Sequence, residues 1–268
     1  MKTIGKWLGI VALGLVVLGL CGCKSTPTAR PFITKWQGAA GSPLYIPIVG
    51  TYTLTWYNEA TPDEQHTEQV TVNTEMGEAC PFVSNPYTFT PPTNGVYVVE
   101  AGPEGVERIL MNFGESDEAA SALLTVEQFG DVVWKDLEMA FRGCFNLQFA
   151  KDIDTPNLSQ CNSLAGMFSG CEAFDSPLAQ WDVSQVTAMN RRFNRCLAFN
   201  QPLEKWDVSS VESMGRMFEK ASAFNQPLEK WDISMNTDMC DMFLESPAGK
   251  LPFVEKWKAA GYRLDRER

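Results

Sequence analysis

Residues 199–207 read Phe-Asn-Gln-Pro-Leu-Glu-Lys-Trp-Asp, and residues 224–232 repeat all nine letters. Residues 174–182 carry an earlier copy, Phe-Asp-Ser-Pro-Leu-Ala-Gln-Trp-Asp, which keeps five of the nine. The copies begin at Phe174, Phe199 and Phe224, so the interval between them is constant, and we call it the repeat period. A fixed period of this length is the signature of repeat architectures, so this stretch decides how the second half of the chain folds.

The same period governs apolar positions outside the nine letters. It recurs at Trp181, Trp206 and Trp231; at Phe168, Phe193, Phe218 and Phe243; and at Met189, Met214 and Met239. One repeat unit cannot bury its own apolar face, whereas stacked units bury a continuous core. We therefore expect these residues to point inward and to lie over their counterparts in about five stacked coils.

Within each repeat the apolar spacing also indicates a helix. The residues at positions i, i+3, i+7 and i+10 are Val186, Met189, Phe193 and Cys196, which form one stripe of a helical surface. Ser209 and Glu212 have the spacing of a capping box. The expected fold class is α+β: a small β-sandwich module followed by a short leucine-rich-like α/β solenoid of about five coils.

A longer motif carries a family resemblance. Residues 181–203 read Trp-Asp-Val-Ser-x-Val-x-x-Met-x-x-x-Phe-x-x-x-x-x-Phe-Asn-x-Pro-Leu. This motif resembles the short bacterial surface-protein repeat that is found in BspA-like and Mycoplasma-type lipoproteins and is related to leucine-rich repeats. Leu123–Gly130 resembles the segment that precedes such repeats, so the resemblance covers about 123–243. It implies exposure at the cell surface, with protein–protein contact or adhesion to host matrix.

The amino terminus has the pattern of a signal peptide. Lys2 and Lys6 precede an apolar run that is too short and glycine-rich for a typical membrane span. The run ends Leu-Cys-Gly-Cys at Cys23, which resembles the lipobox of bacterial lipoproteins. We expect a signal peptide over 1–22 and a lipid anchor of palmitate type on Cys23. Ordinary signal cleavage, with both cysteines incidental, is the alternative.

The expected order of segments follows from these signals. Residues 23–31 form a polar tether, 32–115 the β module, 116–250 the repeats and 251–268 an amphipathic cap on the open end. The expected location is the cell envelope, at the outer membrane or cell surface, with membrane contact through the amino-terminal lipid only.

The β module shows short strand-like runs between turn residues. These runs are Leu44–Val49, Tyr52–Trp56, Gln69–Val72, Val96–Val99 and Arg108–Phe113. Their spacing favours an antiparallel sandwich. Segments 51–56 and 93–101 resemble PKD-like, immunoglobulin-type modules, although the usual Trp-Gly-Asp-Gly turn is absent. Trp56 and Tyr97 have two interpretations: they fill the core, or they stack on a sugar.

The net charge and the histidine content disfavour several classes of partner and of catalytic site. The net charge of −11 disfavours nucleic acid and anionic lipid as partners. His66 is the single histidine, so a Ser-His-Asp relay, a Cys-His pair or a multi-histidine zinc site would have to use it. We expect no enzyme, no cofactor and no metal.

Two polar ladders permit more than one interpretation. Cys144, Cys171 and Cys196 share a repeat position with Ala221 and Ser246, which favours a small buried group, with inter-coil disulfides as the alternative. The second ladder is Asp182, Asp207 and Asp232. Each of these carboxylates either accepts a hydrogen bond from a backbone amide at a helix start or binds calcium between coils.

Charged repeat positions are the candidates for partner contact. The candidate residues are Arg191, Arg192, Arg195, Glu204, Lys205, Glu229 and Lys230, with the arginine cluster favoured. The sequence thus predicts a non-catalytic surface lipoprotein that recognises a host-matrix protein or another surface protein through its repeats. The alternative is a carbohydrate-binding or carbohydrate-active envelope lipoprotein that uses the β module.

Overall fold

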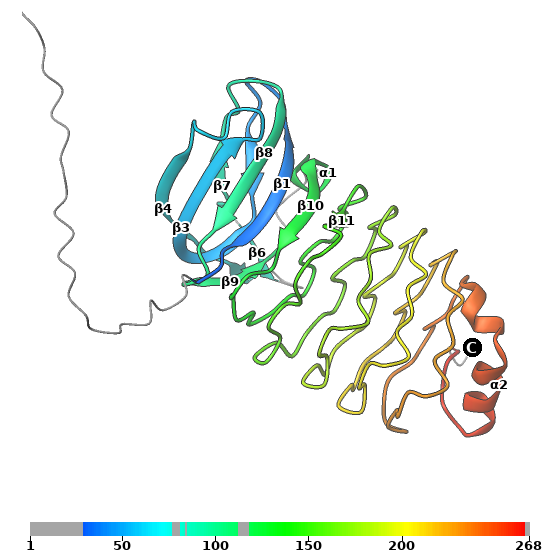
Figure 1. The fold of residues 1–268 in the computed structure, drawn as a ribbon. Coiled ribbons are helices and arrows are strands. Elements are labelled where there is room, and N and C mark those ends of the chain that lie inside the picture. Colours follow the sequence, from blue (N-terminus) through cyan, green and yellow to red (C-terminus); the bar gives the residue numbers. More distant parts are fainter. Residues whose placement is uncertain (1–28, 77–80, 84, 112–117, 266–268) are drawn as a thin grey trace, which may run out of the picture.

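The computed structural model describes residues 29–76, 81–83, 85–111 and 118–265. A twisted sheet occupies the amino-terminal part, and a stack of coils leads from it to a carboxy-terminal helix (Figure 1). The signal peptide and Cys23 lie outside the described residues, as does most of the tether.

The large sheet has seven strands in the order β11-β10-β1-β8-β3-β4, with β9 also paired to β3. The strands are β1 (Phe32–Gly38), β3 (Ile48–Asn58), β4 (His66–Val72), β8 (Gly95–Ala101), β9 (Val106–Ile109), β10 (Leu123–Gln128) and β11 (Gln148–Phe149). Only β10 and β11 pair in parallel; the other pairs are antiparallel.

Two small sheets accompany the large one. One pairs β2 (Leu44–Ile46) with β7 (Tyr87–Phe89), and the other pairs β5 (Glu75–Met76) with β6 (Pro81–Phe82). The Phe89 ring of β7 stacks on Trp56 of β3 at 4.0 Å between ring centres. The opposite face of β3 carries Thr51 and Thr53, which are exposed. The expected β-sandwich is therefore wrong, because a mixed seven-stranded sheet with one open face replaces two sheets packed face to face.

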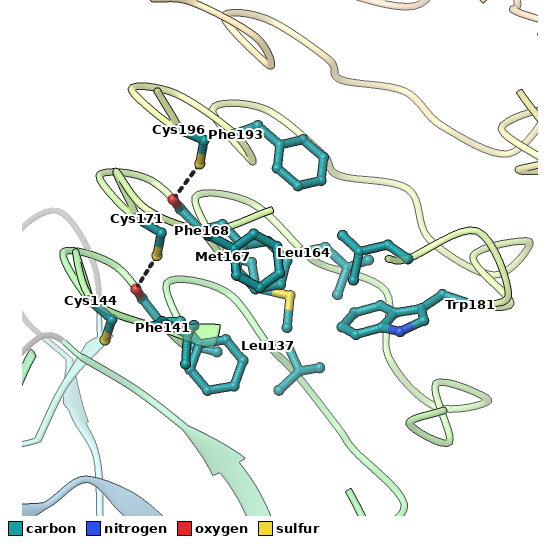
Figure 2. Packing of buried hydrophobic residues seen from close by; sticks show 14 of the residues in the cluster. Leu137, Phe141, Cys144, Leu164, Met167, Phe168, Cys171, Trp181, Phe193 and Cys196 are labelled. Carbon is teal, nitrogen blue, oxygen red and sulfur yellow. Dashed lines mark hydrogen bonds between the residues drawn. The ribbon is translucent and has the colours of Figure 1, made fainter. Parts of the chain in front are cut away.

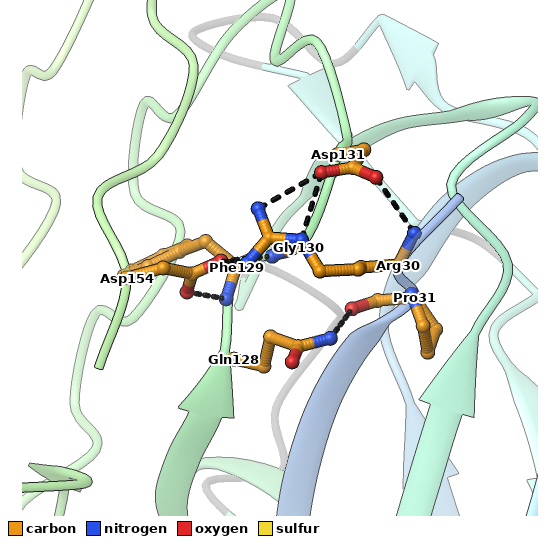
Figure 3. Close-up of polar contacts among 7 residues, drawn as sticks. All are labelled: Arg30, Pro31, Gln128, Phe129, Gly130, Asp131 and Asp154. Carbon is orange, nitrogen blue, oxygen red and sulfur yellow. Dashed lines mark hydrogen bonds and ion pairs between the residues drawn. The ribbon is translucent and has the colours of Figure 1, made fainter. Parts of the chain in front are cut away.

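β10 joins the sheet to the coils. The segment expected to precede the repeats is this strand, and it pairs with β1 on one side and β11 on the other. Arg30 reinforces the junction: its side chain lies 2.8 Å from the Asp131 carboxylate and 3.1 Å from Asp154 (Figure 3). The Asp154 carboxylate in turn accepts the backbone N–H groups of Phe129 and Gly130. The start of the described chain is thus fixed to the first coils.

Backbone hydrogen bonds hold neighbouring coils together. Met189, Arg191, Phe193 and Arg195 donate their N–H groups to the carbonyls of Ser213, Gly215, Met217 and Glu219, at 2.8–2.9 Å. The N–H groups between them, such as that of Arg192, bond back three residues within the same coil. Equivalent sets of four bonds join the coils on either side.

The expected helices inside the repeats are wrong. The described helices are α1 (Glu118–Ala122), α2 (Pro252–Ala259) and the 3₁₀ helix η1 (Pro247–Lys250), all outside the repeated stripe. Arg191 and Arg195 have φ values of 55° and 58°, and a left-handed residue every fourth position breaks a right-handed helix. The stripe is instead a run of tight turns, so the expected leucine-rich-like α/β solenoid is wrong and the chain is mostly β with few helices.

The inward orientation of the periodic apolar residues is confirmed. The Phe, Met and Trp residues predicted for the core are all buried, including Phe243 at the last coil. The rings of Phe168 and Phe193 stack at 5.7 Å (Figure 2), and the Phe193 ring stacks in turn on that of Phe218 at 5.5 Å. One hydrophobic cluster continues from the sheet through these rings to α2.

The polar letters of the nine-residue motif also bond between coils. The Trp206 and Trp231 indole nitrogens donate to the backbone carbonyls of Leu178 and Leu203 at 3.0 and 2.9 Å. The Asn200 side-chain oxygen accepts the backbone N–H of Asn225 at 3.1 Å. Buried polar groups need such partners, which explains why the tryptophan repeats with the apolar letters.

The carboxy-terminal segment covers the last coil. Phe253, Val254 and Trp257 of α2 are buried, and Trp257 stacks with Phe243. The backbone N–H of Asp241 in the last coil donates to the Leu264 carbonyl at 2.9 Å. The last coil is therefore covered by α2 and by the segment that follows it.

Candidate functional site

Two rows of left-handed residues run along one side of the coils. The first row is Met139, Gly166, Arg191, Arg216 and Asp241, and the second is Gly143, Gly170, Arg195, Lys220 and Glu245. Their φ values lie between 55° and 79°. In both rows the residues before the last coil donate their backbone N–H groups to carbonyls of the next coil. We call these backbone hydrogen bonds between coils the stacking bonds, and the left-handed conformation places their donors.

These rows bring basic side chains of adjacent coils together. Arg191 and Arg195 are exposed on one coil, and Arg216 and Lys220 hold the same two positions on the next. We call these four residues the basic patch. Because each coil bonds through its backbone directly to the next, like charges are neighbours in each row.

Acidic residues of the last coil balance one half of the patch. An Nη nitrogen of Arg216 lies 3.4 Å from Asp241, and the Lys220 amine lies 3.7 Å from Glu245. On the other side, the neighbours of Arg191 and Arg195 in their rows are Gly166 and Gly170. Within the described part of the chain, no ion pair involves Arg191 or Arg195.

Arg192 does not belong to this surface. Its side chain is 0% exposed, and its guanidinium carbon lies 4.4 Å from the Trp206 ring centre and 5.4 Å from that of Trp181. All three guanidinium nitrogens are buried and without a hydrogen-bond partner among the described residues. The prediction of Arg192 as a contact residue is therefore wrong, because its position belongs to the core.

A hollow of about 400 Å³ opens beside the patch. It is lined by Asn190, Arg191, Ser213, Gly215, Arg216, Asp238 and Cys240. The Asp238 carboxylate accepts the Cys240 backbone N–H at 3.0 Å. A Cβ atom at Gly215 would lie 3.2 Å from that carboxylate, so the glycine keeps the hollow open.

Comparison with known families connects the coils with one of them. Residues 135–257 match the family described as "Mycoplasma protein of unknown function, DUF285". This match supports the Mycoplasma-type repeat resemblance, and it includes the coils and most of α2. No curated protein and no solved structure shows a significant match to the chain. We call residues 135–257 the DUF285 region.

The remaining predicted contact residues also lie in the DUF285 region, but they occupy other positions of the repeat than the residues of the basic patch. Lys230 pairs with Glu204 of the preceding coil at 3.1 Å, so these two residues bond to each other. Lys205 and Glu229 are exposed. The structure therefore separates the predicted set into a patch at Arg191 and Arg195, an inter-coil ion pair and a buried arginine.

The cysteine ladder of the DUF285 region consists of free thiols. Cys144, Cys171 and Cys196 are fully buried and unpaired. The thiols of Cys171 and Cys196 donate to the carbonyls of Phe141 and Phe168 at 2.9 Å (Figure 2). Burial raises the pKa of all three thiols well above the ordinary range. The predicted small buried group is confirmed, and inter-coil disulfides at these positions are wrong.

The aspartate ladder bonds to nearby serines. One carboxylate oxygen of Asp182 accepts both the backbone N–H and the hydroxyl of Ser184, and Asp207 does the same with Ser209. The serine hydroxyl, followed by the amide, lowers the pKa of both carboxyls. The predicted bond to a backbone amide is confirmed at these two residues, but it holds a turn and not a helix start.

The aromatic residues of the sheet are core residues. Trp56 lies between the rings of His66 and Phe89, at 4.1 and 4.0 Å, with interplanar angles of 16° and 12°. Tyr97 is fully buried. The core interpretation of both residues is confirmed, because each broad face of the Trp56 ring is already covered.

The described residues contain neither a membrane-spanning helix nor a cluster of metal-ligating side chains. Within residues 29–76, 81–83, 85–111 and 118–265, no helix has the length and apolar character needed to span a bilayer. The same residues contain no cluster of three or more His, Cys, Asp or Glu side chains suited to a metal ion.

Sequence reasoning missed Arg216 and Gly215, whereas Lys220 was already among the exposed repeat positions that it favoured. The signal for Arg216 was present in the sequence, since it lies one repeat period after Arg191 of the predicted cluster. Gly215 occupies the position of Ala165, Asn190 and Cys240 in the other coils.

Proposed function

We propose that the protein is a BspA-like surface lipoprotein that recognises another protein through its coil stack and catalyses no reaction. The observation that carries the proposal is the basic patch, where the stacking bonds present Arg191 and Arg195 beside Arg216 and Lys220. A hydrogen-bonded scaffold that repeats at a fixed period suits the display of side chains to a partner.

Three further features support the proposal. The signal-peptide and lipobox pattern ending at Cys23 indicates attachment to a membrane through lipid. The family match covers the coils themselves. The resemblance to surface repeats implies adhesion to host matrix or contact with another surface protein.

The location is tested on intact cells that carry the protein. Added protease should remove the DUF285 region if it is exposed outside the cell, while a cytoplasmic marker stays intact. Protection of the DUF285 region until the cells are lysed would contradict surface display.

Binding is tested with the purified mature chain. We expect saturable binding to an immobilised matrix or surface-protein fraction and no binding to the same fraction after protease digestion. Binding that survives digestion but is lost after glycan removal would contradict protein recognition and favour the carbohydrate alternative.

A further inference from the structure

The two halves of the basic patch differ in how their charge is neutralised. Arg216 and Lys220 have acidic neighbours in the last coil, at 3.4 and 3.7 Å. Arg191 and Arg195 have glycines in the preceding coil and basic residues in the following one. Two exposed cations therefore lie beside two others in a chain whose net charge is −11. Because Arg216 and Lys220 already have acidic partners, Arg191 and Arg195 are the half of the patch that is free to pair with an external anion.

The hollow next to Arg191 adds hydrogen-bonding groups. Asn190 contributes an amide and Ser213 a hydroxyl, and Arg216 borders the same space. Guanidinium groups bind planar carboxylates through two parallel hydrogen bonds. The lining thus combines two guanidinium groups and neutral donors with the single carboxylate of Asp238, so the cations outnumber the anion and suit one incoming carboxylate and the polar chain that carries it.

The acidic residues around the patch restrict the kind of anion. Asp238 lines the hollow, and Asp241 and Glu245 pair with the other half of the patch. A dense polyanion, such as a nucleic acid or a sulfated glycan, would place charge against these carboxylates as well as against the arginines. An extended peptide with separated carboxylates avoids this repulsion.

We infer that the hollow and the exposed cations Arg191 and Arg195 form a docking site for an acidic segment of a partner protein. This inference rests on the proposed function, because it specifies the chemistry of the partner recognised by the coils. The carboxylates of the segment pair with Arg191 and Arg195, and its polar groups bond to Asn190 and Ser213. Gly215 leaves the space that the segment enters.

The test uses the mature chain and a fluorescent peptide of alternating aspartate and serine. A peptide of alternating asparagine and serine is the neutral comparison, and heparin is the polyanion comparison. We expect salt-sensitive binding of the acidic peptide that weakens at least tenfold in the R191E/R195E double variant. The R191Q/R195Q variant removes both charges without reversing them and should also weaken binding.

The matched control is Lys205→Glu, which reverses an exposed charge outside the patch. This variant should bind the acidic peptide as the wild type does, and circular dichroism should show all variants folded. Equal binding of the neutral peptide, unchanged binding by R191E/R195E, or heparin binding that exceeds peptide binding would each overturn the inference.

The same variants separate this inference from the proposed function. If R191E/R195E binds the matrix or surface-protein fraction as the wild type does, the docking site is wrong while surface recognition stands. If the acidic peptide binds through the arginines but the mature chain binds no protein fraction, the site stands and the proposed function is wrong.

Discussion

The guanidinium carbon of Arg192 lies 4.4 Å from the centre of the Trp206 ring, inside the coil stack. The equivalent residues in neighbouring coils are Met167 and Met217, both fully buried. Cation–π attraction compensates the buried charge in part, but all three guanidinium nitrogens lack hydrogen-bond partners among the described residues. A buried charge without such partners is costly.

Replacement of Arg192 by methionine should stabilise the protein. The variant restores the apolar residue of the neighbouring coils, and exchange of a buried charge for a packed apolar side chain is worth about 1–4 kcal/mol in favourable cases. Urea unfolding of wild type and R192M measures the difference. The matched control is Met217→Arg, which should destabilise. A lower unfolding midpoint for R192M than for the wild type would show that the aromatic rings fully compensate the charge.

The gain from R192M should depend on pH. Burial lowers the pKa of Arg192 to about 9, whereas the unfolded chain keeps the much higher ordinary pKa of an arginine. Between these values the unfolded state binds more protons, so wild-type stability rises with pH relative to R192M. The unfolding free energy of R192M should exceed that of the wild type by the largest amount below pH 9, and this difference should shrink above pH 9. Urea unfolding of both proteins from pH 7 to 10.5 tests this, and a constant difference would contradict the lowered pKa.

Arg192 shows where sequence reasoning fails at the site. Its residue type favours an exposed position, and its two arginine neighbours strengthen that impression. Its position in the repeat instead indicates the core, because the residues one repeat period before and after it are Met167 and Met217. Position in the repeat therefore predicts burial better than residue type does, as it also did for the buried phenylalanines and tryptophans.

The secondary structure of the coils could not be derived from apolar spacing alone. Intervals of three and four residues arise in a helix, and they also arise in a succession of tight turns. The distinguishing signal is Gly166 and Gly170, which occupy the positions of Arg191 and Arg195 in the preceding coil. Glycine at two positions four residues apart indicates left-handed backbone, which a helix does not contain. The strands of the sheet were easier to predict from the sequence, since apolar and polar residues alternate with period two in Tyr52–Trp56.

The buried thiols should resist alkylation in the folded protein. Cys144, Cys171 and Cys196 have no solvent exposure, and burial raises their pKa values, so the reactive thiolate is scarce. Cys240 is half-buried and should react. Iodoacetamide treatment at pH 8, followed by peptide mass spectrometry, resolves the four sites. Denaturation before treatment should label all of them, and equal labelling of Cys171 and Cys240 in the folded state would contradict the packing.

Glycine should be more stabilising than alanine at Lys220, the reverse of the usual order. Lys220 has a φ of 60° and donates its backbone N–H to the Leu244 carbonyl at 2.8 Å. Both K220G and K220A lose the amine and its ion pair, so the comparison isolates the backbone. A side chain in the left-handed region costs about 1–2 kcal/mol, whereas glycine adopts it freely. We therefore expect K220G to exceed K220A by about 1 kcal/mol in unfolding free energy, measured by urea denaturation.

The control pair for this comparison is E229G and E229A. Glu229 is exposed in the neighbouring repeat and is not among the positive-φ residues. Alanine should match or exceed glycine there, since glycine loses more backbone freedom on folding. If alanine were also the better residue at position 220, the left-handed conformation would not be a property of the folded coil. The four stacking bonds between coils would then need a different backbone geometry, because the left-handed residues are among their donors.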